Sequence, residues 1–203
     1  MFFSEHVMQV VWVRGASMAP FLNENYETTH TRSDMVLVSM WPWAAGWSWP
    51  WARAAERERE KDGERRRRIM ERGMVVTFRS PANPSHVAVK RIIGLPGDRV
   101  FARHPYAKDS QIVPFNHVWL EGDADDPRKS LDSNTYGPVS MSLVTGRVVA
   151  VLRPRFRWLD WADWENGVFD NGGGKKPVEG YRRGVRERVV KEAVDLEEGP
   201  VVA

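Results

Sequence analysis

Short apolar runs of strand length recur along most of the chain. They are rich in Val and Ile, and Gly, Pro, Asp or Asn residues bound them. The runs are "VMQVVWV" (7–13), "DMVLVSM" (34–40), "GMVVTF" (73–78), "HVAVKRIIG" (86–94), "DRVFA" (98–102), "HVWLEGD" (117–123) and "GRVVAVL" (146–152). Because such runs are typical of short antiparallel strands joined by hairpins, the pattern predicts a mainly β fold. "GLPGD" at Gly94–Asp98 places Pro and then Gly at the central positions of an expected type II turn.

One region that breaks this pattern lies between two of the expected strands. Five of the ten tryptophans fall between Trp41 and Trp51, and residues 52–72 alternate in charge sign and contain many good helix formers. This charged half favours a solvated helix broken at Gly63. Two interpretations stay open: an insertion between core strands, or a membrane-surface patch with Trp at the headgroup level and Arg on anionic lipid.

The end of the chain also breaks the strand pattern. "DNGGGKKP" has the composition of a linker, and "YRRGVRERVVKEAVDLEEG" has the periodicity of a short amphipathic helix. We therefore expect four parts, with the β core divided in two by the insertion. These are a first core part (1–40), the Trp/Arg-rich insertion (41–72), a second core part (73–160) and a linker with a C-terminal tail (161–203).

The charge of the chain is concentrated in the insertion. Arg53–Arg72 holds nine Lys/Arg and six Asp/Glu residues, a net charge of +3, which equals the net charge of the whole chain. A basic face spread over a folded surface, which nucleic-acid binding requires, is not indicated. The run "RRRR" at Arg65–Arg68 is the one feature that favours a nucleic-acid partner, and we expect none.

Composition removes several kinds of site. The chain has no cysteine, which excludes thiol nucleophiles, disulfides and Cys-ligated zinc, and its five histidines lack metal-ligand spacing. The acidic loop that starts at Asp123 has Arg128 and Asn134 where a calcium loop needs Gly and Glu. We expect no metal and no cofactor. No run approaches the roughly 20 apolar residues of a membrane-spanning helix, and the start lacks the features of a signal peptide.

Two residues carry the candidate chemistry. Ser17 follows a small-residue bend directly after the first apolar run. Lys90 lies beside Arg91 within an apolar strand, so each face of that strand must accommodate one cation. Desolvation lowers the pKa of a lysine and turns it into a general base, a role that an arginine cannot take. Taken alone, a serine in such a bend is more often an ordinary turn residue, and a lysine in such a strand is more often a surface residue. Ser130 and Asp132 follow in a loop after a strand, where they can orient a base.

Four motifs in order resemble the signal peptidase I family of serine proteases (S26). They are "GASMAPFL", "RGMVVTFRSP", "VAVKRIIGLPGD" and "GDADDPRKSLDSNTYGPVS". "SLDSNTYGPVSMSLVTGRVVAVL" and "RPRFRW" favour the mitochondrial inner membrane branch of that family. The resemblance covers residues 7–40 and 73–158. It implies a signal-peptidase-like antiparallel β fold, also found in self-cleaving repressors, with the charged insertion and the short helical tail added.

The resemblance implies roles for particular residues. Ser17 and Lys90 match the catalytic Ser/Lys dyad, and the Ser17 N–H matches an oxyanion donor. Ser130 matches a serine that contacts the lysine, and Asp132 matches an acidic residue that organises the same loop. Further matches, expected to be structural, are Asp123, Gly97 and Asp98.

The sequence departs from the family pattern at three places. Gly15 stands where some bacterial relatives carry a serine that supports the oxyanion hole, so a second donor is not identified. Asn134 replaces an arginine that is usual in bacterial members. The family also places a membrane anchor ahead of the serine motif, whereas sixteen residues precede Ser17. Either the start lies upstream or is misassigned, or a partner subunit holds this chain at the membrane.

The expected function is that of an endopeptidase. It would remove sorting sequences from proteins delivered to the mitochondrial intermembrane space, working on the inner membrane beside the other peptidase subunit. Small residues before the cleaved bond and a substrate bound as an added strand are expected. The alternative is a non-catalytic or weakly active subunit that stabilises a partner protease. A self-cleaving repressor would need a DNA-binding domain ahead of Ser17.

Overall fold

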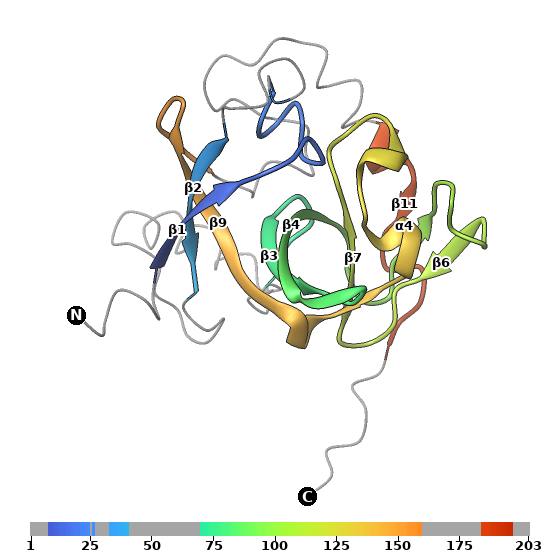
Figure 1. Cartoon of the computed structure of the whole chain (residues 1–203). Helices are drawn as coiled ribbons and strands as arrows, with labels where there is room; N and C mark the ends of the chain where they lie inside the picture. The colour runs from blue at the N-terminus through green and yellow to red at the C-terminus, as the bar shows by residue number, and fades with distance from the viewer. Residues whose placement is uncertain (1–7, 25, 27–32, 41–69, 160–183, 197–203) are drawn as a thin grey trace, which may run out of the picture.

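Most of the described chain forms antiparallel β structure (Figure 1). The computed structural model describes residues 8–24, 26, 33–40, 70–159 and 184–196. The strands are β1 (Met8–Val13), β2 (Asp34–Ser39), β3 (Val75–Ser80), β4 (Asn83–Gly94), β5 (Arg99–Phe101), β6 (Ser110–Ile112), β7 (His117–Glu121), β8 (Val139–Ser140), β9 (Val144–Arg153), β10 (Arg157–Trp158) and β11 (Val189–Val190). The short helices are η2 (Pro127–Lys129), α4 (Ser133–Tyr136) and η3 (Met141–Leu143).

Two sheets contain these strands. The larger has eight strands in the order β1-β2-β9-β3-β4-β7-β8, with β10 paired to β9. The smaller has the order β11-β5-β6. Every pairing in both sheets is antiparallel. The mainly β prediction is confirmed, and all seven predicted strands are present.

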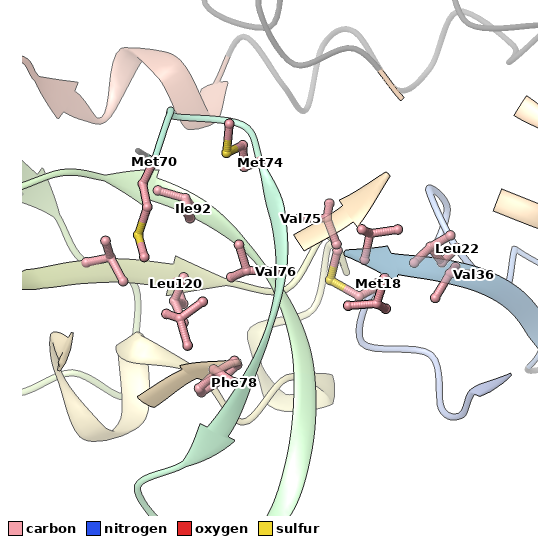
Figure 2. Packing of buried hydrophobic residues seen from close by; sticks show 14 of the residues in the cluster. Met18, Leu22, Val36, Met70, Met74, Val75, Val76, Phe78, Ile92 and Leu120 are labelled. Carbon is pink, nitrogen blue, oxygen red and sulfur yellow. The ribbon is translucent and has the colours of Figure 1, made fainter. Parts of the chain in front are cut away.

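The hydrophobic core lies mainly on the larger sheet (Figure 2). Phe78, Ile92 and Leu120 are fully buried in it and come from three adjacent strands, β3, β4 and β7. A second cluster, between β4, β5, β7 and the C-terminal segment, contains Trp119 and Val185. Both β4 and β7 contribute to the two clusters, and β4 is also the strand that carries Lys90.

The predicted turn at Gly94–Asp98 is present. The Asp98 N–H donates to the Leu95 carbonyl at 3.0 Å, and Gly97 has φ +87°, a conformation that favours glycine at the third position of a type II turn. A Cβ on Gly97 would lie 2.5 Å from the carbonyl oxygen of Val194. The C-terminal segment therefore packs directly against this turn.

The C-terminal tail differs from its prediction. The expected helix over 181–199 is wrong beyond residues 184–187, because β11 follows and pairs with β5. Val185 and Val189 are apolar and pack on the second cluster, while Arg188 between them pairs with a buried carboxylate. These tertiary contacts outweigh the local helical periodicity.

The insertion lies almost entirely outside the described residues, since residues 41–69 are not among them. Its predicted helix and lipid contact therefore stay predictions. Residues Met70 and Arg72, at the expected end of the insertion, pack in the core: Met70 is buried in the main cluster, and Arg72 donates to both oxygens of Asp98. The other domain boundaries stay predictions.

Candidate active site

Ser17 lies in the loop that follows β1. The side chains of Met18 and Leu22 anchor this loop in the core, and the Leu22 N–H donates to the Met18 carbonyl at 2.8 Å (Figure 2). Gly15 has φ +86°, and a Cβ there would meet nothing within 4 Å. The backbone conformation, rather than lack of space, favours glycine at this position. Ser17 itself is half-buried.

Lys90 reaches Ser17 from the middle of the larger sheet. Its Nζ lies 2.6 Å from Ser17 Oγ and also donates to the Val89 carbonyl at 3.1 Å. Only 4% of the residue is exposed. The sequence-based expectation that Ser17 and Lys90 come together is met in the geometry of the structure.

The environment of Lys90 favours its neutral form. Burial lowers the pKa of Lys90 from the ordinary 10.5 to about 8, against the opposing fields of Asp132 and Asp123. A charged lysine can only donate, whereas the neutral amine has a lone pair that accepts the serine proton. The site therefore holds a base that is partly neutral near physiological pH.

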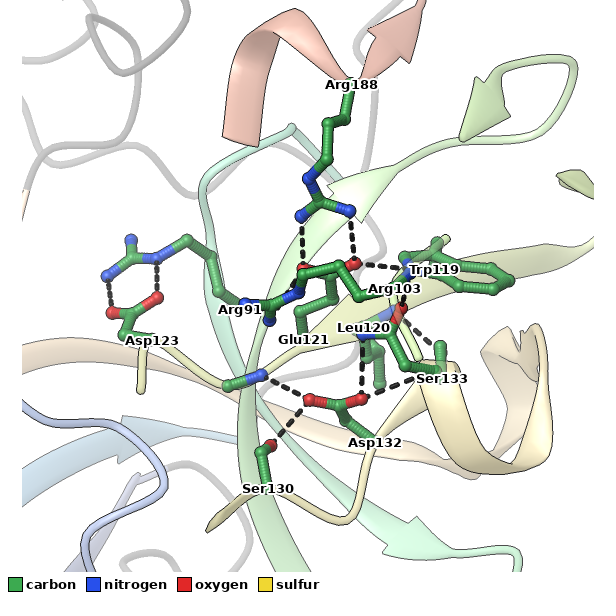
Figure 3. Close-up of polar contacts among 12 residues, drawn as sticks. Arg91, Arg103, Trp119, Leu120, Glu121, Asp123, Ser130, Asp132, Ser133 and Arg188 are labelled. Carbon is green, nitrogen blue, oxygen red and sulfur yellow. Dashed lines mark hydrogen bonds and ion pairs between the residues drawn. The ribbon is translucent and has the colours of Figure 1, made fainter. Parts of the chain in front are cut away.

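The alternation predicted for β4 is confirmed. Lys90 and Arg91 leave the strand on opposite faces, and both are buried. Arg91 binds both carboxylate oxygens of Asp123, with 2.8 Å between Nε and Oδ1, and donates to the Gly73 carbonyl at 2.7 Å (Figure 3). Asp123 thus joins the loop after β7 to the strand that carries Lys90.

The loop after β7 packs closely against the loop that carries Ser17. The Ala124 N–H donates to the Ser17 carbonyl at 3.2 Å. A Cβ on Gly122 would lie 2.4 Å from the Ser17 carbonyl oxygen and 2.3 Å from Ser130 Oγ. No larger residue fits at Gly122 without moving the backbone of Ser17, a requirement that the sequence did not reveal.

Ser130 and Asp132 lie beneath the dyad, but their contacts differ from those expected. Ser130 Oγ donates to Asp132 Oδ2 at 2.6 Å, and no hydrogen bond joins it to Lys90 (Figure 3). Asp132 also accepts from the Gly122 N–H at 2.9 Å and from the Asn134 N–H at 3.0 Å. The expected contact of Ser130 with the lysine is therefore replaced by a bond to Asp132, which holds the loop together.

Asn134 joins Asp132 to the loop after β5. Its Nδ2 donates to Asp132 Oδ1 at 3.1 Å, and its Oδ1 accepts from the Arg103 N–H at 2.7 Å. The described partners of Asp132 are all neutral donors. Its negative charge is consequently not cancelled by a bonded cation.

Among the described residues, no hydrogen bond joins Gly97 or Asp98 to Ser17 or Lys90, and their structural role stays a prediction. Asp98 is fully buried and binds Arg72 through both oxygens at 2.7 Å. It also accepts from the backbone N–H groups of Leu95 and Glu192. Asp98 thus connects the turn, the start of the second core part and the C-terminal segment.

Sequence reasoning missed a buried carboxylate next to this site. Glu121 ends β7 and is fully buried, bound by Arg188 at 2.7 Å, Arg103 at 3.2 Å and Trp119 Nε1 at 2.9 Å (Figure 3). Burial acts to raise its pKa, but the two guanidinium groups and the indole N–H together lower it. Arg188 stands 67 positions from Glu121, so no local pattern could indicate the pair.

The described residues contain neither a metal-binding cluster nor a membrane-spanning helix. No group of three or more His, Cys, Asp or Glu side chains is arranged to hold a metal ion there. In the same part of the chain, no helix has the length and apolar character needed to cross a membrane.

The chain is similar to known proteins over most of its length. A family model described as signal peptidase, peptidase S26, matches residues 1–105, which include Ser17 and Lys90. Mitochondrial inner membrane protease subunit 2 of Saccharomyces cerevisiae is 33% identical over 155 residues, covering 76% of this chain and 73% of that protein. Its counterpart in Schizosaccharomyces pombe is 37% identical over 154 residues, covering 76% and 69%.

More limited matches accompany these. Human mitochondrial inner membrane protease subunit 1 is 39% identical over 87 residues, covering 42% of this chain and 51% of that protein. A crystal structure of a signal peptidase I from Enterococcus faecalis covers 38% of this chain and 95% of that one, at 23% identity and a TM-score of 0.32. From the family match and the subunit 2 relatives together, the chain belongs to the S26 signal peptidase family.

Proposed function

We propose that the chain is a serine endopeptidase in which Ser17 is the nucleophile and Lys90 the general base. The observation that carries this proposal is the 2.6 Å separation between Lys90 Nζ and Ser17 Oγ, in a site where burial lowers the lysine pKa to about 8. A nucleophile within hydrogen-bond reach of a base that is held near neutrality is the arrangement that activates a serine hydroxyl.

The reaction follows from these two groups. Neutral Lys90 takes the hydroxyl proton while Ser17 Oγ attacks the carbonyl carbon of the substrate. Lys90 then gives that proton to the leaving amine nitrogen as the peptide bond breaks, and an ester to Ser17 remains. A water molecule next attacks the ester carbonyl as its proton passes to Lys90, and Ser17 regains a proton as the acid product leaves.

The structure also offers a donor for the charge that develops on the carbonyl oxygen. The Ser17 N–H donates to no other described residue, so it is available to an oxyanion. Gly15 has no hydroxyl to add to it.

Substrates and surroundings are proposed from the relatives. Their names refer to a protease of the mitochondrial inner membrane, and matches to both subunits 1 and 2 favour a hetero-oligomer with a related subunit. We propose that the chain acts on precursors delivered to the intermembrane space, at the lipid surface of that membrane and facing that space. β1 is an outer strand of the larger sheet and runs into the nucleophile loop, which suits a substrate bound as an added strand.

The test is Ser17→Ala at the native locus, followed by mass spectrometry of the N-termini of intermembrane-space proteins. Uncleaved precursors are expected to accumulate while this chain and its partner stay at normal levels, and they would identify the substrates. Ser85→Ala is the matched control, because Ser85 is exposed on β4. The N-termini of intermembrane-space proteins in this strain should equal those of wild type.

A contrary result has a definite meaning. If every N-terminus in the Ser17→Ala strain matches wild type, the chain is not the protease, and the reading as a stabilising subunit replaces it. Loss of the partner subunit in that strain, with the precursors unprocessed, would point to the same reading.

A further inference from the structure

Asn23 closes the loop that carries Ser17. It is 1% exposed and has φ +59°, a backbone conformation that few residues other than glycine adopt and that asparagine tolerates best. A polar residue buried in such a conformation requires an explanation from its surroundings.

The carboxamide of Asn23 uses all of its hydrogen-bonding groups. Nδ2 donates to the carbonyls of Val13 and Gly15, each at 2.8 Å, and Oδ1 accepts from the Asp34 N–H at 2.6 Å. The Asn23 N–H in turn donates to Asp34 Oδ2 at 2.9 Å. One side chain therefore ties together the end of β1, the loop before Ser17 and the start of β2.

These bonds, with one from the backbone, constrain the two peptide groups that precede Ser17. Asn23 holds the Gly15 carbonyl, and the Ala19 N–H holds the Ala16 carbonyl at 3.0 Å. In a planar trans peptide the C=O and the N–H point in opposite directions. Fixing these two carbonyls therefore fixes the N–H groups of Ala16 and Ser17, and neither of them donates to another described residue.

We propose that Asn23 is a positioning residue for the reaction at Ser17, an inference that rests on the proposed function. Its carboxamide holds the Gly15–Ala16 peptide and with it the Ala16 N–H, and thereby constrains the adjoining Ala16–Ser17 peptide, whose N–H is aimed at the oxyanion before substrate binds. Donors oriented in advance stabilise charge that appears only in the transition state, so their loss lowers kcat more than it raises KM. The side chain thereby supports an oxyanion site in which Gly15 supplies no hydroxyl.

The experiment compares Asn23→Asp with Asn116→Asp in the full chain together with its partner subunit. Both asparagines have positive φ, but Asn116 is exposed at a loop away from the dyad. The exchange keeps the shape of the side chain and removes the two N–H donors. The probe is a fluorogenic peptide that spans a cleavage site found in the Ser17→Ala experiment. We expect kcat to fall about tenfold to a hundredfold for Asn23→Asp with KM within twofold, and Asn116→Asp to equal wild type.

A second readout separates positioning from simple destabilisation. An aldehyde of the same peptide adds to Ser17 Oγ, its carbonyl oxygen becomes the alkoxide of the adduct, and the serine proton passes to Lys90. The inhibition constant of this aldehyde should rise for Asn23→Asp by the same factor as kcat falls, because the alkoxide of the adduct occupies the oxyanion position. A variant that is merely less stable would lower the active fraction and leave this constant unchanged.

Three outcomes would overturn the inference. They are a wild-type kcat for Asn23→Asp, a rise in KM alone, or an unchanged aldehyde constant. If Asn23→Asp does not fold, Asn23→Gly keeps the positive φ without the carboxamide, with Asn116→Gly as its control, and wild-type kcat in Asn23→Gly is equally decisive. Activity that survives Ser17→Ala would instead refute the proposed function itself.

Discussion

Two carboxylates, Asp123 and Asp132, raise the pKa of Lys90, but only one of them is paired with a cation among the described residues. Asp123 is bound by the Arg91 guanidinium, which offsets its charge, whereas the described partners of Asp132 are neutral donors. Burial is the larger effect and lowers the lysine pKa, and Asp132 is the stronger of the two opposing fields. The same carboxylate that organises the loop therefore also limits how far the lysine is driven toward its neutral form.

Lys90→Met tests this balance through stability. The pKa of Lys90 is about 8 in the folded chain and near the ordinary 10.5 when unfolded, so between these values the unfolded state binds the extra proton. Stability contributed by this group therefore rises as pH increases from about 8 to 10.5, by up to about 3 kcal/mol. Relative to Lys90→Met, wild type should gain stability over that window in denaturant titrations at several pH values.

The control for this experiment is Lys108→Met, at an exposed lysine. Its stability difference from wild type should not change across the same pH window. A Lys90→Met difference that is equally flat would show that the folded site does not depress the lysine pKa.

At the scale of elements, the end of β7 connects the nucleophile to the C-terminal segment. Glu121 binds Arg188, which comes directly before β11. The next residue, Gly122, contacts the nucleophile loop and donates to Asp132. The buried ion pair of Glu121 and Arg188 therefore supports the position of Gly122, which contacts the loop that carries Ser17.

Arg188→Ala should be strongly destabilising. It leaves Glu121 buried with Arg103 as its one remaining described cation, and an under-compensated buried charge costs about 2–4 kcal/mol. Acid unfolding should also begin at higher pH, because the Glu121 pKa is held low in the folded state partly by Arg188, and stability from such a group is lost as pH falls.

Arg128→Ala is the comparison, because Arg128 forms an exposed ion pair with Asp126. Screening by solvent makes such a pair worth little, so its urea midpoint should stay at the wild-type value. Equal midpoints for the two variants would contradict the importance of the buried pair.

At the scale of the whole molecule, the C-terminal segment is part of the folded core. It adds β11 to the smaller sheet, supplies Val185 to the second cluster and crosses the turn at Gly97. There the Val194 N–H donates to the Gly97 carbonyl at 3.0 Å. Contacts between residues almost a hundred positions apart thus complete the smaller sheet.

Gly97→Ala should detach this segment. The new Cβ would lie 2.5 Å from the Val194 carbonyl oxygen, and φ +87° is strained for alanine, so we expect a loss of about 1–3 kcal/mol by thermal or chemical unfolding. Gly184→Ala is the matched control, since a Cβ there meets nothing within 4 Å. Similar losses in both variants would argue against close docking at the turn.

Local patterns were sufficient for much of the fold. The seven predicted strands overlap β1, β2, β3, β4, β5, β7 and β9, because alternating or continuous apolar runs bounded by turn residues report burial directly. The two- and three-residue strands β6, β8, β10 and β11 were not predicted. Segments that short show no repeating pattern of apolar positions. Pairing with neighbouring strands, and not their own residues, determines that they form strands.

The sequence by itself determined the family and the candidate residues of the site: Ser17 on a small-residue bend, Lys90 within an apolar strand, and the motif order that placed both in one family. The tertiary structure alone decided what surrounds them. Ser130 turns to Asp132 instead of Lys90, Asn23 binds the carbonyls ahead of Ser17, and the tail folds onto Glu121. These contacts join residues through space, and hydrogen-bond direction and burial depend on packing that no local spacing encodes.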